Sequence, residues 1–523
     1  MYRKVLFIFI FLSFALSASS VEEHIIPSVK DSESPGGQKN SPEGVYPVRN
    51  SGLSKDEDIV SGGVYLTLEE VCQLALNNNF DIQLAQFDAQ FKQTDLDSAR
   101  SVYDTLIEVG TNFKDDRKKT VSSLTGTSQE ARNYNFAVSQ KLPTGTTLGA
   151  GFNHQRSWTD SAYVAVNPAH DAQAELTLKQ ELGRNFFGIQ DRSKIKISKI
   201  DIENAQYTSL DKIEQTLSEV QKTYWKIAQY LNLLGIRQDM LLEAKQLFQI
   251  NQEKLKKGII EKPQLLASEA NLRQKEIDLI LVKNELQFHI NELRLLLNLD
   301  NLDEIVLPAQ SLDFTGQQIE LSQSLKSAFQ YRRDYFLAEN EIKAKKIKLV
   351  MQKNNLWPEI NLEASVTRNG LDNHFSQAIQ DISSEDNPEY FLGLKIKFPL
   401  QNRQAKSEFN KAKIEQAKAL LELKKIERQI LVEIKDGVRN CQVLEQRALK
   451  QNNVVRLQEE KLAAELKAYQ YGRSDTDTVI RYQDDLLSSK ILYAQALFDY
   501  KQSLIELALK ENILLGHFWK DEL

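Results

Sequence analysis

The chain contains GIIEKPQLLASEANLRQKEIDLILVKNELQFHINELRLLL at residues 258–297 and GRSDTDTVIRYQDDLLSSKILYAQALFDYKQSLIELALKE at residues 472–511. Each stretch opens with a glycine and then repeats apolar residues every seven positions, which is typical of a helix that packs lengthwise on another helix. The heptad positions are Leu272, Leu279, Leu286 and Leu293 in the first stretch and Leu486, Tyr493, Tyr500 and Leu507 in the second. The two stretches superpose at an offset of 214 residues, so we expect two copies of one helical hairpin.

A second offset relates the earlier part of each half. At 253 residues Leu68 falls on Leu321 and Asp81 on Asp334. The offsets differ by 39 residues (253 − 214), so the first half carries an insertion of that size. Repeats this far apart indicate duplication of a whole folding unit. We expect the first unit at residues 64–310 and the second at residues 311–516.

Composition favours a largely helical protein. The chain has 523 residues, 41% of them hydrophobic and 26% charged, with only 11 prolines. The net charge is −6 and acidic and basic residues alternate, which leaves no basic patch suited to nucleic acid. The sequence contains no phosphate-binding glycine loop and no nucleophile elbow.

Histidines do not follow the spacing of a metal site. They stand alone, without the i, i+4 or cysteine-paired pattern of zinc ligands, at His24, His154, His170, His289, His374 and His517. Weak surface binding at His154, His170 and His374 is the alternative. We therefore expect no enzyme, no catalytic residue, no cofactor and no metal.

The N-terminus has the order of a secretory signal. Arg3 and Lys4 precede an apolar run at residues 5–16 and small residues at 17–20. A buried helix is the alternative. Residues 1–20 are thus expected to be a signal peptide, residues 21–63 a disordered leader and residues 517–523 a tail.

The two cysteines match core positions of the other copy. Cys441 falls on Ile227 at offset 214, and Cys72 falls on Leu325 at offset 253. We expect both to be small core residues. A disulfide between them is the alternative in an exported protein.

Between the helices the apolar period changes from 3.6 to 2. Alternation of apolar and polar residues predicts strands at about 104–114, 172–182, 359–368 and 391–400, two in each half. Their lengths suit tilted strands that cross a bilayer. A soluble sheet packed on its apolar face is the alternative. The same alternation flanks a Pro-Thr-Gly turn and predicts an extra hairpin at about 132–156, expected to project outside the cell and to form either barrel strands or an extracellular loop.

Aromatic residues stand beside prolines where helices and strands meet. Trp357 precedes Pro358, and Phe398 precedes Pro399. We expect Trp357 and Phe398 to lie at a membrane interface, where aromatic side chains gather.

Four strands are too few to close a barrel. A sheet in lipid must close, and small barrels have about eight strands, so two or three copies would have to share one.

Helix lengths agree with an elongated assembly. The long helices are expected at about 186–257 and 401–471, and two shorter ones stacked end to end match each of them. The shorter helices are expected at about 68–103, 259–299, 321–356 and 473–515.

These features resemble the outer membrane efflux proteins, the TolC-like outer-membrane factors. The resemblance covers residues 65–516 and rests on LTLEEV at 66–71, the two hairpin glycines and GRSDT at 472–476. It implies a mainly α homotrimer with a 12-stranded membrane β-barrel and a long α-helical periplasmic tunnel. Such a protein lies in the outer membrane of a Gram-negative bacterium and contacts its lipid.

The resemblance also implies partners. A periplasmic adaptor and an inner-membrane transporter would dock on the tunnel, which would serve a tripartite efflux or type I secretion system as a passive duct for solutes or polypeptides. The turns at Gly258 and Gly472 would form the periplasmic tip that the adaptor contacts.

Gating residues depart from the family pattern. Relatives carry acidic residues six and nine positions after the second glycine, where this chain has Thr478 and Arg481. Asp477, Arg481 and Asp484 share one helix face and form a substitute set of candidate gate charges. A merely solvated face is the alternative.

Two other classes of protein remain open. A periplasmic adaptor would show one hairpin flanked by β-rich domains, and a coiled-coil scaffold would lack the strands between the helices.

Overall fold

The computed structural model describes residues 63–119, 126–299, 305–384 and 387–517. All of them belong to one compact unit, Asp56–Leu523. The expected signal peptide, the leader up to residue 62 and the tail from residue 518 lie outside the described residues.

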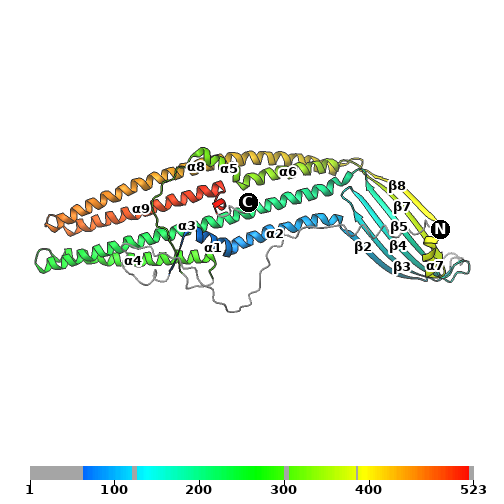
Figure 1. Cartoon of the computed structure of the whole chain (residues 1–523), viewed down its shortest axis with the longest axis horizontal. Helices are drawn as coiled ribbons and strands as arrows, with labels where there is room; N and C mark the ends of the chain where they lie inside the picture. The colour runs from blue at the N-terminus through cyan, green and yellow to red at the C-terminus, as the bar shows by residue number, and fades with distance from the viewer. Residues whose placement is uncertain (1–62, 120–125, 300–304, 385–386, 518–523) are drawn as a thin grey trace, which may run out of the picture. The chain divides into compact units, whose positions relative to one another are not determined.

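Two helical hairpins form most of the unit (Figure 1). The first joins α3 (Ile189–Lys256) to α4 (Lys262–Leu297), and the second joins α8 (Arg403–Gln470) to α9 (Thr476–Glu511). Both long helices have 68 residues and both short ones have 36. The heptad pattern and the match between the two halves thus located these four helices within a few residues.

The other two expected helices are each broken in two, contrary to the prediction of continuous helices at 68–103 and 321–356. The pieces are α1 (Leu68–Asn78), α2 (Phe80–Arg100), α5 (Leu321–Tyr331) and α6 (Arg333–Asn354). The breaks fall at Asn79 and Arg332, whose ψ angles of 129° and 120° are extended. These two residues match at the 253-residue offset.

Contacts with the neighbouring hairpin favour both breaks. The Asn79 amide donates to the carbonyl of Leu296 at 2.7 Å, and the Arg332 guanidinium donates to the carbonyl of Lys510 at 3.4 Å. Leu296 and Lys510 match at the 214-residue offset. Each break residue therefore ties a short helix to the C-terminal end of its hairpin.

The main core lies midway along α3. Tyr224 is fully buried there, and its hydroxyl donates to the Leu66 carbonyl at 3.1 Å. Leu66 ends β1 (Gly63–Leu66), which pairs in parallel with β6 (Ile305–Pro308). These four-residue strands were not foreseen, because they are too short to show a period.

Both cysteines are buried and free. Burial raises the pKa of Cys72 to about 12, and the Cys441 thiol contacts the Ser503 carbonyl at 3.3 Å. The core interpretation holds for both, and the disulfide alternative is wrong.

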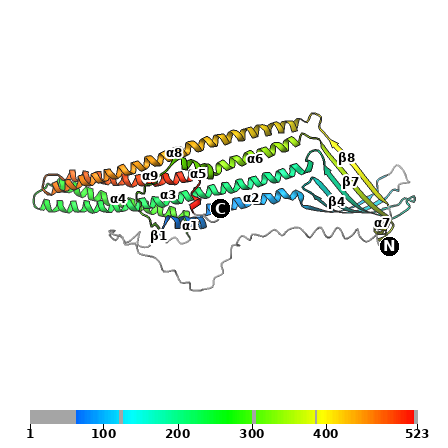
Figure 2. The same cartoon turned by 45° about the horizontal axis from the view of Figure 1, so that its top comes forward.

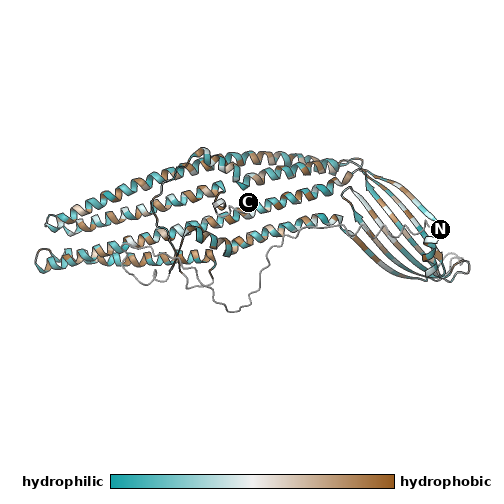
Figure 3. Ribbon diagram, viewed as in Figure 1, coloured by the Kyte–Doolittle hydropathy of each residue, from teal (hydrophilic) through white to brown (hydrophobic). Residues whose placement is uncertain are grey.

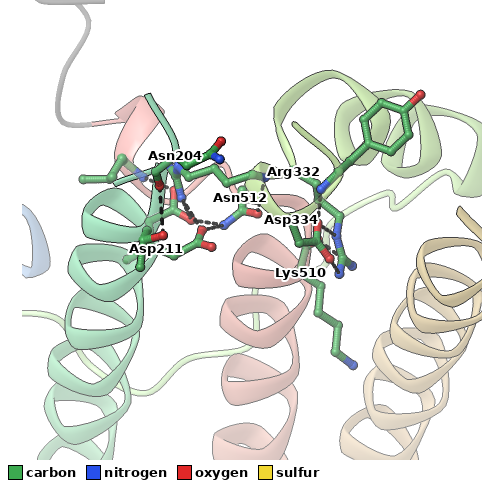
Figure 4. A network of polar contacts seen from close by, with 11 residues as sticks. Asn204, Asp211, Arg332, Asp334, Lys510 and Asn512 are labelled. Carbon is green, nitrogen blue, oxygen red and sulfur yellow. Dashed lines mark hydrogen bonds and ion pairs between the residues drawn. The ribbon is translucent and has the colours of Figure 1, made fainter. Parts of the chain in front are cut away.

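A buried polar network joins the two halves beside this core (Figure 4). Arg333 on α6 contacts Asp211 and Glu214 of α3 at 3.1 and 2.9 Å. Glu214 is fully buried and also accepts from Asn512, after α9, at 2.7 Å and from the backbone of Leu515 at 3.1 Å. Every partner of the Glu214 carboxylate thus lies in the second half.

Six strands form one antiparallel sheet beyond the ends of α2, α3, α6 and α8, which Figure 2 shows running toward it. In spatial order the strands are β2 (Thr105–Asp116), β3 (Gln129–Lys141), β4 (Thr146–Thr159), β5 (Ala169–Glu181), β7 (Glu359–Asp372) and β8 (Pro388–Lys397). Helix α7 (Phe375–Ser384) lies between β7 and β8 in sequence. Short 3-10 turns occupy Ser101–Tyr103, Phe186–Gly188 and Leu515–His517.

The extra hairpin is part of the sheet. Strands β3 and β4 pair with each other and with β2 and β5 along nearly their whole length. Their turn packs on the start of α3, where the N–H of Gly145 donates to Leu142 and a Cβ on Gly188 would lie 2.4 Å from the Pro143 carbonyl. Of the two alternatives, the hairpin supplies strands of the sheet and is not a separate loop. The expected projection of the hairpin is wrong for its turn, which lies at the helical end of the sheet against Gly188.

The two faces of the sheet differ in polarity, as the alternating colours of Figure 3 show. Directly paired residues place one apolar set on a single face: Ile107, Val109, Phe136, Val138, Leu148, Phe152, Leu176, Leu178, Leu362, Val366, Leu392, Leu394 and Ile396. The opposite face carries hydrogen bonds and ion pairs, such as Asn133 to Asn112 at 2.8 Å and Lys179 to Glu363 at 3.5 Å. We call these the apolar face and the polar face.

Replacing Arg333 with Met should lower the free energy of unfolding by about 3–5 kcal/mol, because Glu214 would stay buried without its cation. Arg439→Met is the matched control: Arg439 pairs with Asp436 on the exposed side of α8 at 2.8 Å. Its removal should cost less than about 1 kcal/mol. Thermal unfolding of the two variants in detergent measures the difference, and equal losses would contradict the importance of the network.

Candidate functional site

Two matching turns end the hairpins, and we call them the hairpin tips. Gly258 and Gly472 have φ angles of 70° and 72°, in the left-handed region. The next residues, Ile259 and Arg473, donate to carbonyls five positions back, both at 2.9 Å. This is the Schellman arrangement that glycine favours at helix ends.

The second tip has a stronger helix start than the first. The Asp475 carboxylate accepts from the N–H of Thr478 at 2.7 Å, and this bond lowers the pKa of Asp475. At the first tip Glu261 makes no such cap, and a proline stands within the first two residues of α4.

Buried polar side chains hold the two tips together. The Tyr469 hydroxyl, from α8, donates to Asn251 of α3, and Asn251 donates to the hydroxyl of Thr476 at 3.3 Å. Asn251 and Thr476 are fully buried. The Lys254 ammonium lies 3.5 Å from the centre of the Tyr469 ring and donates to its carbonyl at 3.1 Å, while burial lowers its pKa. We call Asn251, Lys254, Tyr469 and Thr476 the tip cluster.

The structure separates the three candidate gate charges. Asp484 pairs with Lys275 of the other hairpin at 2.5 Å, and Lys275 is almost fully buried. Asp477 and Arg481 are exposed, and the Arg481 guanidinium lies 5.4 Å from the neighbouring Tyr482 ring. One charge therefore connects the hairpins and two face solvent.

Sequence reasoning missed the tip cluster and Lys275. Asn251 and Lys275 lie within helical segments rich in polar residues, where nothing distinguishes a buried polar side chain from a solvated one. Lys275 is buried against α9, where its partner Asp484 lies 209 residues later in the sequence.

The two predicted interfacial aromatics lie at the end of the sheet that adjoins the helices. Trp357 directly precedes the Pro358-Glu359 start of β7, and Phe398 directly follows β8. Both side chains are exposed. Their place at a membrane interface stays a prediction.

Apolar side chains also remain exposed on both outer helices. On α2 they recur on one side at Phe80, Leu84, Phe87 and Phe91. On α8 a groove is lined by Leu421, Lys424, Lys425, Arg428, Gln429, Val432 and Glu433. Helix α2 contacts α3, and α8 contacts α6 and α9, so both stripes lie at the outer edges of the helical layer.

The strands at the ends of the sheet have one free edge each. Strand β2 pairs only with β3, and β8 pairs only with β7, within the described residues. Each edge leaves backbone groups without partners, which invites pairing with another strand.

No sign of a metal centre or a membrane-spanning helix exists in the described part of the chain. No group of three or more His, Cys, Asp or Glu side chains there could hold a metal ion. His154 and His170 instead contact each other, with Nε2 and Nδ1 3.0 Å apart. None of the described helices combines the length and hydropathy needed to cross a bilayer.

The fold matches known channels, although neither a family model nor a curated protein matches the sequence. The CmeC outer membrane channel of Campylobacter jejuni matches 91% of this chain and 94% of its own, with a TM-score of 0.62 and 14% identity. The open state of the MtrE outer membrane channel of Neisseria gonorrhoeae matches 91% of this chain and 97% of its own, with a TM-score of 0.63 and 14% identity. CusC, whose structures are reported to reveal changes that accompany transmembrane channel formation, matches 87% of this chain and 95% of its own. Its TM-score is 0.65 and its identity is 15%. This chain has the fold of outer membrane channels.

Gly258→Ala and Gly472→Ala should each lower the free energy of unfolding by about 1–2 kcal/mol, because an L-residue is strained at a left-handed φ. Space is not the reason, since an added Cβ would meet nothing within 4 Å at either position. Gly235→Ala, equally open but within α3, is the control and should stabilise the chain by about 0.5–1 kcal/mol. Thermal unfolding midpoints give the comparison; losses of equal size at all three positions would refute the role of φ.

Proposed function

We propose that this protein is an outer-membrane channel that continues as a helical tunnel into the periplasm of a Gram-negative bacterium. The observation that carries the proposal is a sheet with one apolar and one polar face, joined end-on to long helical hairpins. Lipid would contact the apolar face, and water would fill the space beside the polar face. The likeness in fold to outer membrane channels supports the same role.

Closure of the sheet requires other copies of the chain. Strands β2 and β8 run in opposite directions, because six strands alternate between them. The free β8 edge of one copy can therefore pair antiparallel with the β2 edge of the next, and the apolar stripes on α2 and α8 would meet in the same interface. Repeating one head-to-tail contact generates a ring.

The number of strands changes the expected barrel. The expected 12-stranded barrel assumed four strands from each of three chains. Each chain has six strands in its sheet, because the extra hairpin joins it. A homotrimer would then close an 18-stranded barrel, an even number as antiparallel closure demands. Barrels of that size leave an aqueous channel.

The helical part supports a duplicated tunnel wall with a contact site at its tips. Matching helix lengths, break residues and tip turns support the origin of the halves by duplication. The tips at Gly258 and Gly472 would contact a periplasmic adaptor, which would connect the channel to an inner-membrane transporter. The channel itself would be a passive duct of tripartite efflux or type I secretion, with energy supplied by the transporter.

Polar contacts between the hairpins would control the tunnel entrance. The tip cluster and the Lys275–Asp484 pair hold the two hairpins together with hydrogen bonds and charge. Asp477 and Arg481 are exposed beside them and would face ions that enter. The rival classes fit less well, since an adaptor or a scaffold has no use for a six-stranded sheet with an uncovered apolar face.

Asp477→Asn and Asp484→Asn should each change cation conductance in planar bilayers. Loss of the exposed Asp477 charge removes an attraction for cations near the entrance, and loss of Asp484 also breaks its pair with Lys275. The wild-type assembly should form channels in the same recordings. Asp436→Asn, on α8 and paired with Arg439, is the control. Unchanged conductance in both tip variants would return these residues to a solvated face, and a wild-type protein that forms no channels would refute the proposed function.

An epitope tag in the loop at the far end of the sheet should be reachable by antibody on intact cells. Residues 123–128, between β2 and β3, lie partly outside the described residues. The N–H of Thr127 donates to Asp160 at 2.7 Å, which places it beside the loop between β4 and β5. A tag between Tyr163 and Val164, both exposed, tests the same end. A tag after Gly258 should be reached only in permeabilised cells, and the reverse pattern would overturn the orientation.

A further inference from the structure

Two neighbouring arginines lie on the apolar face near the loop end of the sheet, the end away from the long helices. Direct pairing places Phe113, Arg132, Arg156 and His170 side by side on β2, β3, β4 and β5. Because directly paired residues point to the same side of a sheet, both arginines share the face of Phe136 and Leu176.

The two arginines lack an anionic partner in the described part of the chain. The structure gives Arg132 a stacking contact with Phe113, 5.4 Å from guanidinium to ring centre, and gives neither arginine an ion pair with a described carboxylate. Like charges directly opposite each other on a sheet are destabilising, with Cβ atoms about 4.5–5.5 Å apart. An anion between the guanidiniums would remove this repulsion.

The acidic side chains on the same face lie in other rows or bind other partners than Arg132 and Arg156. Asp372 lies opposite His170 and accepts from the N–H of His374 at 2.8 Å. Asp115 pairs with Arg117 at 3.0 Å. Glu130 lies opposite Asp115, one row closer to the loops than Arg132. Asp381 of α7 lies on this face too, beside Gly370. Among the described residues, none of these four acidic side chains forms an ion pair with Arg132 or Arg156.

Helix α7 marks where the apolar band ends. It packs on the same face, since a Cβ on Gly370 would lie 2.0 Å from the Ala378 carbonyl. Its first residue, Phe375, meets the His154 ring edge-on at 4.6 Å. Phe375 and Ile379 remain exposed beside the sheet. A short helix with exposed apolar residues at the end of an apolar band suits the layer of lipid head groups.

We propose that Arg132 and Arg156 bind the phosphate of an outer-leaflet glycolipid, with α7 lying beside the same head group. This inference rests on the proposed function, which makes the apolar face the lipid face. Guanidinium groups match phosphate oxygens with paired hydrogen bonds, so two of them facing each other form a clamp for one phosphate. Lipid is the source of the phosphate because the row borders the apolar band.

Native mass spectrometry of the full-length assembly in detergent tests the site. The probes are bisphosphorylated lipid A and the same lipid after removal of its phosphates. Wild type should retain the phosphorylated probe, and the double variant Arg132→Gln, Arg156→Gln should bind it at least about tenfold more weakly, as expected when two charge-assisted contacts are lost. Lys114→Gln is the control, because Lys114 lies on the polar face of β2 and pairs with Asp116 at 2.9 Å.

Three outcomes overturn the inference. They are equal retention by wild type and the double variant, equal retention of the lipid with and without phosphates, and full displacement of the lipid by millimolar inorganic phosphate, which would make free phosphate the ligand. The assay needs only the folded sheet. A wild type that binds lipid A but forms no channels would therefore refute the proposed function alone, and variants that conduct normally but bind equally would refute the lipid site alone.

Discussion

Unpaired backbone groups along β2 and β8 impose the strongest constraint on this molecule. Under the proposed function this sheet lies in lipid, where N–H and C=O groups cannot stay unpaired, so its two edges would have to meet. Because six strands alternate in direction, the edges are complementary and one repeated contact can satisfy them. The exposed stripes on α2 and α8 lie at the corresponding edges of the helical layer, so the same contact would cover the remaining apolar surface.

The helical part has a different constraint. Its 68-residue helices must stay aligned although no single globular core runs along their whole length. It concentrates its rigid contacts midway, where Tyr224 is buried and Arg333 reaches Glu214. Breaks at Asn79 and Arg332 let two short helices stack against one long helix while each still bonds to its hairpin. The central contacts thus fix the hairpins, and the tip cluster together with the apolar contact of Leu247, Tyr469 and Val479 joins their ends.

The sequence predicted what depends on periodicity and missed what depends on tertiary contact. Heptads located α4 and α9, the match between the two halves located α3 and α8, and alternation located every strand of the large sheet. At Asn79 a local N-cap, with its side chain accepting from the N–H of Ile82 at 3.1 Å, and a bond to the Leu296 carbonyl both favour the break. Arg332 has no such cap, and its bonds to Glu433 and to the Lys510 carbonyl depend on the tertiary fold. The tip glycines were found because a left-handed turn needs glycine. The tip cluster was not, since a buried Asn251 looks like any polar helix residue.

Under the proposed function, the contacts at the tips would have to separate when the tunnel opens. Apolar packing holds the centre of α3. At the tips, Asn251, Tyr469 and Thr476 add hydrogen bonds to a smaller apolar cluster of Leu247, Tyr469 and Val479. A hydrogen bond lost inside a protein can be replaced by one to water, so opening the tip to solvent costs about 0.5–1.5 kcal/mol for each bond. Separating apolar core residues has no such replacement. Under the proposed function, opening the tip would thus require the small Leu247, Tyr469 and Val479 cluster to separate, while the larger apolar core at the centre keeps the hairpins folded.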